Sequence, residues 1–377
     1  MSTLKVNAIE SQATDSAPTI AGLQYPTDGP LSNRNLIING AMQVAQRGTA
    51  TVTGSGKYPV DRFRQNSNTA AVVTAVQSAA TPAGFLNSIK LENTSADSSI
   101  DAGDAWSVQQ IIEGYNIQHL NWGTADAKNV TVSFWARSSQ TGTFCLILLG
   151  SSNGSDLDKS YVSEYTIDTA NTFEYKSITV PGPTSGTAWS NSNNRGLCVR
   201  WGLSCGTDEQ QAAGSWGTVN ASGSSNQTQL LSTANSTFYL TGVQVEVGDT
   251  ATPFENRSYG DELARCQRYY INYRYGESGA ATTDGMGFYG SHLSGTNKWQ
   301  FAWVYFPTTM RAQPAVKTSD KNGNEEKISL WTSSAGALTN NSTPYSVNPS
   351  TDRFAFSDYL NTKYGIVLCG YKADAEL

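Results

Sequence analysis

The run from Phe238 to Tyr270, FYLTGVQVEVGDTATPFENRSYGDELARCQRYY, constrains the fold more than any other part of the chain. Its first part alternates, which predicts a strand with Tyr239, Thr241, Val243, Val245 and Val247 on one face and Phe238, Leu240, Gly242, Gln244 and Glu246 on the other. Because both faces carry apolar bulk, this strand is expected inside a sheet. The run then turns at Gly248-Asp249 and starts a short amphipathic helix near Ser258.

Length and composition favour a large β-rich protein. At 377 residues the chain is too long for one ordinary core, so two domains and a tail are expected. Only 15% of residues are charged, while nine Trp, eighteen Tyr and twelve Phe are available for sandwich cores. A net charge of −6 without a basic stripe argues against nucleic-acid binding, and no apolar run reaches the ~20 residues of a membrane helix. The N-terminal sequence lacks a secretory apolar core, so assembly in a cytoplasm is expected.

Residues 35–257 read as one β-sandwich of jelly-roll type, in which short strands are separated by loops rich in Gly, Ser, Asn and Pro. The predicted strands are 71–77, 88–92, 106–112, 130–137, 144–149, 161–167, 174–180, 197–203 and 238–247. The segment TVSFWARS gives one plainly apolar face, formed by Val132, Phe134 and Ala136. The fold class expected for the chain is therefore all-β.

The remaining residues fall into three parts. Residues 1–34 form an extended N-terminal arm, because Pro18, Pro26, Gly29 and Pro30 break regular structure. A linker helix is expected over 258–270, with acidic residues early and basic residues late, as the helix dipole favours. Residues 271–377 are expected to form a second, smaller β-rich domain.

The order of the sequence phrases resembles that of a known class of proteins. The phrases NLIINGAM, DRF, VTVSFWARS, SITVPG and FYLTGVQVEVG follow the order found in carbohydrate-binding modules of jelly-roll type. The run after Phe238, together with YFPTTMRAQPAV, resembles the junction and distal domain of bacteriophage tail fibres and virion appendages, including cyanophage-type fibres. This resemblance implies a homotrimer in the virion, with the arm bound to other tail or capsid proteins.

Catalytic motifs are sparse. The two histidines, His119 and His292, stand outside any HExxH or Cys/His pattern, and neither GxSxG nor a P-loop occurs. The local carboxylate pairs lie in polar loops or on alternating strands and are read mainly as solvated groups. Calcium is a possible structural ion, because such modules often carry one; its candidate ligands are Asp61, Asp101, Asp104 and Glu246.

Tryptophans give the clearer lead to a ligand. An exposed indole stacks on a sugar ring while neighbouring polar groups bond the hydroxyls. The candidate carbohydrate-binding residues, chosen for their polar neighbours, are Trp122, Trp189, Trp216 and Trp299. The alternative is that each ring is buried under its own loop or at a subunit contact.

These observations favour a non-enzymatic phage virion appendage protein that binds host-surface glycan. Its expected partners are itself, other virion proteins and the glycan, without nucleic acid or membrane insertion. One alternative is a purely structural virion adaptor or decoration protein. A polysaccharide depolymerase is the third, and the lack of a repeated β-helix pattern counts against it.

Overall fold

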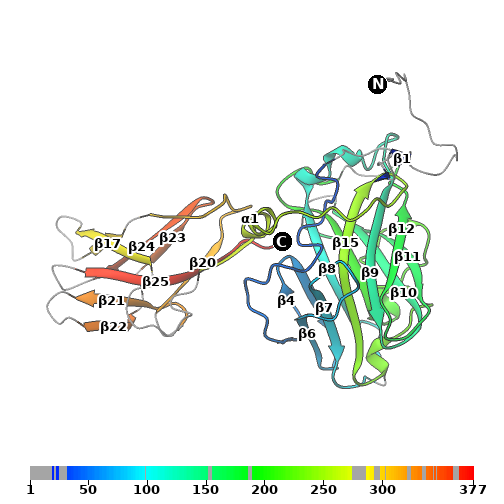
Figure 1. Ribbon diagram of the computed structural model, residues 1–377, viewed down its shortest axis with the longest axis horizontal. Coiled ribbons are helices and arrows are strands. Elements are labelled where there is room, and N and C mark those ends of the chain that lie inside the picture. Colours follow the sequence, from blue (N-terminus) through cyan, green and yellow to red (C-terminus); the bar gives the residue numbers. More distant parts are fainter. Residues whose placement is uncertain are drawn as a thin grey trace, which may run out of the picture. The chain divides into compact units, whose positions relative to one another are not determined.

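The computed structural model describes residues 19–20, 23–24, 32–97, 99–151, 155–185, 189–273, 286–292, 298–301, 303–320, 324–332, 337–342, 344, 346–359 and 365–377. The chain divides into two compact units, residues 1–258 with 377, and residues 259–376. Strands dominate both, and one α-helix occurs in the described ranges, α1 (Tyr259–Gln267) (Figure 1). The expected all-β fold with a jelly-roll sandwich is confirmed. In the described part of the chain, no helix is long and apolar enough to cross a bilayer.

Two antiparallel sheets form the sandwich of the first unit (Figure 1). The seven-stranded sheet has the order β14 (Trp216–Gly217), β11 (Lys159–Ile167), β10 (Gly142–Gly150), β13 (Arg195–Cys205), β8 (Ala105–Glu113), β5 (Phe63–Asn68) and β4 (Lys57–Val60). The six-stranded sheet has the order β12 (Glu174–Val180), β9 (Val130–Ser138), β15 (Ser236–Val247), β7 (Ser88–Asn93), β6 (Val73–Ser78) and β3 (Val52–Thr53). All nine strands predicted from sequence are present, with ends shifted by a few residues.

Several short elements were not predicted. They are the strands β3, β4, β5 and β14, and the 3₁₀ turns η1 (Gly114–Asn116), η2 (Gln118–Leu120), η3 (Thr207–Glu209) and η4 (Leu230–Ser232). Strands β1 (Thr19–Ile20) and β2 (Leu23–Gln24) pair with each other; otherwise the arm expected over residues 1–34 lies largely outside the described residues.

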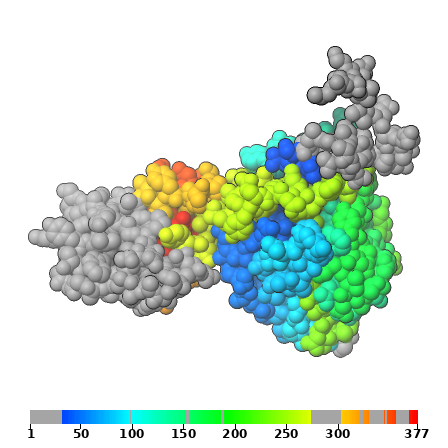
Figure 2. All heavy atoms as spheres, viewed as in Figure 1, coloured from blue at the N-terminus to red at the C-terminus, as the bar shows by residue number. Residues whose placement is uncertain are grey.

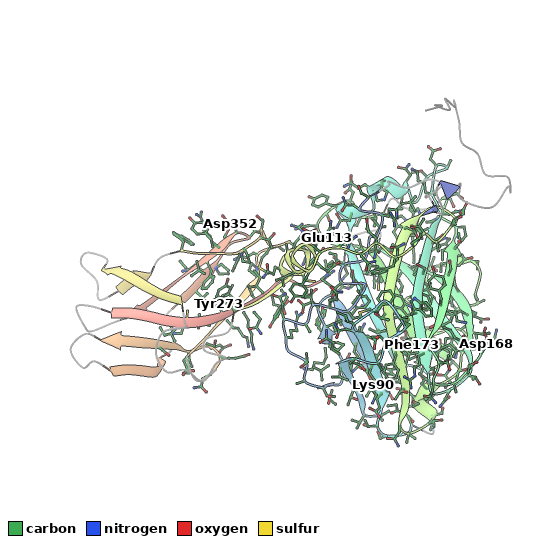
Figure 3. The ribbon with its side chains drawn as sticks, in the orientation of Figure 1. Lys90, Glu113, Asp168, Phe173, Tyr273 and Asp352 are labelled. Atoms are coloured by element: carbon green, nitrogen blue, oxygen red, sulfur yellow. The ribbon has the colours of Figure 1, made fainter. Side chains whose placement is uncertain are left out.

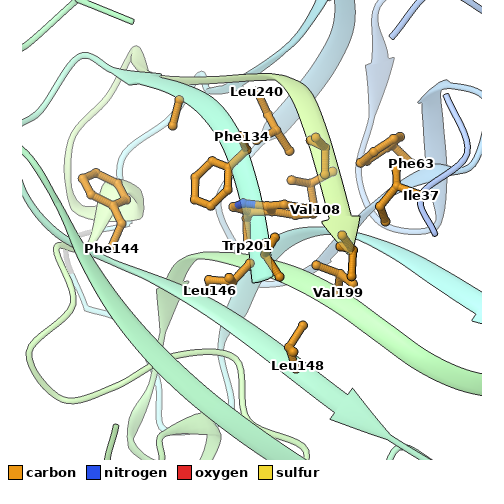
Figure 4. Close-up of a cluster of buried hydrophobic side chains, with 14 of the residues drawn as sticks. Ile37, Phe63, Val108, Phe134, Phe144, Leu146, Leu148, Val199, Trp201 and Leu240 are labelled. Atoms are coloured by element: carbon orange, nitrogen blue, oxygen red, sulfur yellow. The ribbon is translucent and has the colours of Figure 1, made fainter. Parts of the chain in front are cut away.

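The core of the sandwich lies between the two sheets, where alternate side chains of each strand interdigitate. The predicted apolar face of 130–137 is confirmed, since Val132, Phe134 and Ala136 are fully buried there. Figure 4 shows Phe134 beside Trp201, with their ring centroids 5.6 Å apart in an edge-to-face arrangement. Such geometry is favoured by the ring quadrupoles, so the aromatic residues of the sequence stabilise the core.

Strand β15 corrects one detail of the sequence prediction. It lies inside its sheet as expected, between β9 and β7. Side chains at even-numbered positions face the core in its first part, and side chains at odd-numbered positions face the core in its second part. A β-bulge between Thr241 and Gln244 shifts the register, and Gly242 there has a left-handed φ of 62°. The residues that face the core are therefore Phe238 and Leu240 before the bulge and Val243, Val245 and Val247 after it. The extra residue explains why simple alternation assigned the wrong set.

The segment 248–257, here named the polar strap, follows β15 and forms hydrogen bonds with the start of the first unit. The Glu255 carboxylate accepts hydrogen bonds from the backbone N–H groups of Arg34 (3.2 Å) and Asn35 (3.0 Å). Arg257 donates to the carbonyl of Ile37 at 2.9 Å. Figure 2 shows the yellow-green segment of β15 and the strap against the blue segments of the sandwich. These bonds join ends of the unit that are about 220 residues apart in the chain.

Part of the outer face of the seven-stranded sheet is covered by residues of the segment 206–229, such as Ala221 and Ser222. Beneath it lie apolar side chains of β8, β10, β11 and β13: Ile111, Cys145, Ile147, Leu149, Val162 and Cys198. Gly202 permits this close cover, since a Cβ there would lie 2.1 Å from the carbonyl oxygen of Ser222. The part over β5 and β8 carries polar side chains instead, such as Arg64 and Gln109.

The second unit is a ten-stranded sheet arranged around one long strand. Strand β25 (Gly365–Asp374) pairs with four others: β16 (Tyr270–Tyr273), β17 (Met286–His292), β20 (Ala315–Ser319) and β21 (Ile328–Thr332). The remaining strands are β18 (Lys298–Phe301), β19 (Val304–Tyr305), β22 (Ala337–Ser342), β23 (Ser346–Pro349) and β24 (Arg353–Tyr359). Ile271, Phe354 and Tyr371 belong to its buried core.

Candidate functional site

The outer face of the seven-stranded sheet holds a groove of about 620 Å³ over β5, β8 and β13, here named the sheet groove. Its lining is almost entirely polar: Ser55, Arg64, Asn66, Ser67, Asn68, Ala105, Ser107, Gln109, Asp156, Leu157, Asp158, Arg195, Arg200, Glu209, Thr218, Asn220 and Ser222. Strands β5, β8 and β13 form its floor. Its walls come from residues 156–158 and from the segment 206–229.

Arg200 is the most buried charge of the groove, with 7% of its surface exposed. Gln109 lies directly opposite Arg200 on β8, and its Oε1 accepts a hydrogen bond from the Nε of Arg200 at 2.9 Å. Its Nη1 donates to Oδ1 of Asn220 (3.0 Å), the carbonyl of Ala221 (2.8 Å) and Oγ of Ser222 (3.2 Å). These bonds fix the guanidinium plane, so the side chain is oriented before any ligand arrives.

The groove contains charges of both signs. Burial lowers the pKa of Arg200, and the cation of Arg64 acts in the same direction, while the charge of Glu209 opposes them. Arginine nevertheless stays protonated at neutral pH. Oε2 of Glu209 accepts a hydrogen bond from Ser222 at 3.0 Å. Asp156 and Asp158 also line the groove. Such a surface can bond many hydroxyl groups, because it offers carboxylate and amide acceptors beside guanidinium and amide donors.

Three of the four predicted tryptophans meet in one place, here named the tryptophan cluster: Trp122, Trp189 and Trp216. Their ring centroids are 4.7 Å (122 to 189), 5.4 Å (122 to 216) and 5.5 Å (189 to 216) apart, all edge to face. Trp122 and Trp189 belong to the sandwich core, and Trp216 packs against it. Trp122 and Trp189 are buried, with 4% and 9% of their surface exposed.

Local sequence explains why the rings fit together. Gly150 leaves room for Trp189, because a Cβ there would lie 2.0 Å from the indole ring. The Nε1 of Trp122 donates to the carbonyl of Lys128 at 2.6 Å, and that of Trp216 donates to the carbonyl of Pro181 at 2.8 Å. With their polar atoms bonded to backbone, these two rings act as packing groups.

A smaller pocket of about 260 Å³ lies beside the cluster. Trp122 and Trp189 line it together with polar neighbours, which are Gln118, Asn121, Thr124, Ser190 and Asn191. The fourth predicted residue, Trp299, lies on β18 in the second unit, and its side chain is outside the described part of the structure. The sequence analysis thus selected three rings that lie together in the fold, and it did not identify the larger groove.

The four calcium candidates do not gather into one site. Asp61 is buried and accepts hydrogen bonds from the backbone and side-chain nitrogens of Gln46. Glu246 is buried and accepts from the backbone N–H (2.7 Å) and hydroxyl (2.6 Å) of Thr252.

The other two candidates lie in one exposed turn, where Asp104 accepts from the backbone N–H of Asp101 at 2.9 Å. Among the described residues, no group of three or more His, Cys, Asp or Glu could hold a metal ion. The polar surroundings of these residues in the sequence suggest calcium ligands. In the structure, the two buried carboxylates, Asp61 and Glu246, instead accept hydrogen bonds from protein donors.

Sequence reasoning missed the sheet groove for a physical reason. Its residues lie on strands and loops between positions 55 and 222, and the strand pairing brings them together. The available signal was polar side chains at alternate positions of strands, such as Arg64 and Asn66 on β5 or Ser107 and Gln109 on β8. On a sandwich strand, such residues mark the outer face.

No protein-family profile and no curated protein sequence matches this chain. Among solved structures, it is similar to a family 11 carbohydrate-binding module from Clostridium thermocellum in complex with a β-1,3-1,4-mixed-linked tetrasaccharide. The identity is 11%, over 55% of this chain and 99% of that one, with a TM-score of 0.29. A putative sugar binding protein from Bacteroides thetaiotaomicron matches at 12% identity, over 57% and 100%, with a TM-score of 0.33.

The enzymatically active domain of tailspike protein 4 from bacteriophage CBA120 is also similar, at 13% identity and a TM-score of 0.29. The match covers 56% of this chain and 21% of that one, so the chain spans about a fifth of the length of the tailspike chain. At these scores the similarities assign no site, ligand or activity to this chain.

Proposed function

We propose that the sandwich unit binds glycan through the sheet groove, and that the protein is a non-enzymatic phage virion appendage that attaches to host-surface carbohydrate. The observation that carries the proposal is the groove itself: a hollow of about 620 Å³ on rigid strands, lined by guanidinium, amide and carboxylate groups. A volume in this range suits a small-molecule or oligosaccharide segment.

The chemistry of the groove supports a hydroxyl-rich ligand. Sugar hydroxyls both donate and accept hydrogen bonds, so they need acceptors and donors side by side. Asn66 and Asn68 on β5 provide both kinds of atom, and Glu209 provides acceptors on the facing wall. The floor is preorganised because its residues lie on paired strands, which limits the entropy lost on binding.

The virion role rests on the resemblance of the run from Phe238 to Tyr270, and of YFPTTMRAQPAV, to phage appendage proteins. In this proposal residues 1–34 bind another virion protein, and the chain assembles as a homotrimer. Light scattering at micromolar concentration tests the trimer, and a monomer there would contradict it. Copurification with a tail or capsid protein, lost when residues 1–34 are removed, tests the arm.

Glycan binding is tested with the purified chain on an array of bacterial oligosaccharides. The variant Asn66→Trp places an indole inside the sheet groove and is expected to abolish binding. Thr74→Trp, on β6 of the other sheet, is the matched control and should bind as the parent does. Equal binding by both variants would remove the groove from the proposal.

The same preparation separates the alternative functions. A receptor-binding appendage labels host cells in a saturable way, and the labelling is lost after periodate oxidation of surface sugars. A depolymerase releases reducing ends from the bound polysaccharide. A structural adaptor does neither, although it is folded and copurifies with a virion protein.

A further inference from the structure

Two arginines lie in one row across the floor of the sheet groove. Arg64 on β5 is directly opposite Gln109 on β8, which in turn is opposite Arg200 on β13. Directly opposed residues on antiparallel strands are ~5 Å apart, so the two arginine positions are separated by about 10 Å. One glutamine lies between two cations.

Both guanidinium groups keep hydrogen-bond donors that the protein does not use. The four side-chain hydrogen bonds of Arg200 to oxygen atoms come from Nε and Nη1, and the Cys198 thiol is a further, weak partner, so no described oxygen atom accepts from its Nη2. The side chain of Arg64 makes neither a hydrogen bond nor an ion pair with any described residue. A buried guanidinium with unused N–H groups is costly unless a ligand or water bonds it.

Charge pairing within the protein does not neutralise these cations. Within the described ranges, no carboxylate lies within 4.0 Å of Arg64 or Arg200. Glu209 is held by Ser222 instead. Burial lowers the pKa of Arg200, and Arg64 adds to this effect, as expected for two like charges that share a partly dehydrated groove.

We propose that the sheet groove recognises an acidic sugar residue, whose carboxylate is held by Arg200 and Arg64 while neighbouring groups bond its hydroxyls. This inference rests on the proposed function and names its substrate class. Planar guanidinium groups match a carboxylate by paired, charge-assisted hydrogen bonds. Asp156, Asp158 and Glu209 in the same groove favour a ligand with one negative charge, because a phosphate monoester with a charge of −1.5 to −2 would be repelled more strongly.

The test uses an array that holds acidic oligosaccharides, each beside its carboxyl-reduced counterpart, in which the carboxylate has become a primary alcohol. Calorimetry then measures the pairs that bind. The acidic form is expected to bind at least tenfold more tightly, and raising the salt concentration should reduce the difference.

Arg64→Gln separates recognition from folding, because Arg64 makes no bond that the fold requires. It should lower the affinity for the acidic form more than the affinity for the reduced form, and so reduce the preference for the acidic form. Lys90→Gln, on β7 of the other sheet (Figure 3), removes the same charge and should change neither affinity.

The remaining outcomes overturn the inference in distinguishable ways. Equal affinity for both forms would leave glycan binding intact and refute the role of the carboxylate. Tighter binding of sugar phosphates on the same array would refute carboxylate recognition in particular. If the folded protein binds no oligosaccharide of either form, the proposed function fails together with the inference.

Discussion

The tryptophan cluster and the sheet groove lie in the same sandwich but differ in their side chains: the cluster is aromatic, and the residues that line the groove are mostly polar. In the cluster, three rings pack edge to face; two indole N–H groups bond to backbone carbonyls, and the Nε1 of Trp189 has no acceptor among the described residues. In the groove, Arg200 bonds to its polar neighbours, while the half-buried side chain of Arg64 has no hydrogen-bond partner among the described residues. If the groove binds glycan as proposed, the difference teaches that aromatic density alone does not locate a binding site, and that a concave surface with many unused hydrogen-bonding groups is the better guide.

The largest effect is expected from Trp122→Ala, which removes a buried ring from the centre of the tryptophan cluster. It should lower the free energy of unfolding by about 3–5 kcal/mol, as for other large aromatic deletions. Chemical denaturation measures the loss, with Tyr175→Ala on the exposed outer face as a control that costs little. If the variant keeps its stability but loses glycan binding, the cluster is a binding site, and the contrast drawn here between a packing cluster and a binding groove is wrong.

A smaller loss is expected from Gly150→Ala, which pushes a methyl group into the ring of Trp189. Overpacking of this kind costs about 1–3 kcal/mol. Combining it with Trp189→Phe should recover part of the loss, because the smaller ring makes room. Gly103→Ala, where a Cβ meets nothing within 4 Å, is the matched control. Additive losses in the double variant would show that the two sites do not contact each other.

In the groove, Arg200→Lys keeps the charge but cannot reproduce the bonds from Nε and Nη1 to Gln109, Asn220 and Ala221. We expect a loss of about 1–2 kcal/mol in the free energy of unfolding, the magnitude typical of hydrogen bonds from a charged donor. Arg64→Lys should change stability by less than about 0.5 kcal/mol, as for surface substitutions away from such bonds. Equal losses would mean that Arg64 also holds the fold.

The smallest effect is expected for the chemical reactivity of Cys198, which lies beside Arg200 at the edge of the sheet groove. Burial raises the pKa of the Cys198 thiol to about 11, although the charge of Arg200 opposes the shift. At pH 8 only about one molecule in a thousand then carries the thiolate, so iodoacetamide should leave Cys198 unmodified in the folded protein. Denatured protein should react rapidly. Rapid alkylation of the folded protein, detected by mass spectrometry, would show that the segment 206–229 opens.

The sequence predicts the strands of the sandwich because their alternation is local, as in Val132, Phe134 and Ala136. It assigns the faces of β15 incorrectly beyond Gly242, since a bulge adds one residue without a clear change in composition. Local composition also selected the tryptophans, whose loops converge only in the folded chain. The groove depends on long-range pairing, for example between Arg64 and Gln109, which one sequence does not reveal.

The central place of β25 has a consequence for how the second unit is made. Four strands of this unit form backbone hydrogen bonds with residues 365–374. The sheet therefore lacks its central strand until these residues have left the ribosome. The sandwich has all its strands before residue 258 and can fold while translation continues. Ribosomes that stall before residue 365 would therefore release chains with a native sandwich attached to strands that lack their shared partner. Such chains would be targets for proteases and for aggregation through unpaired edges.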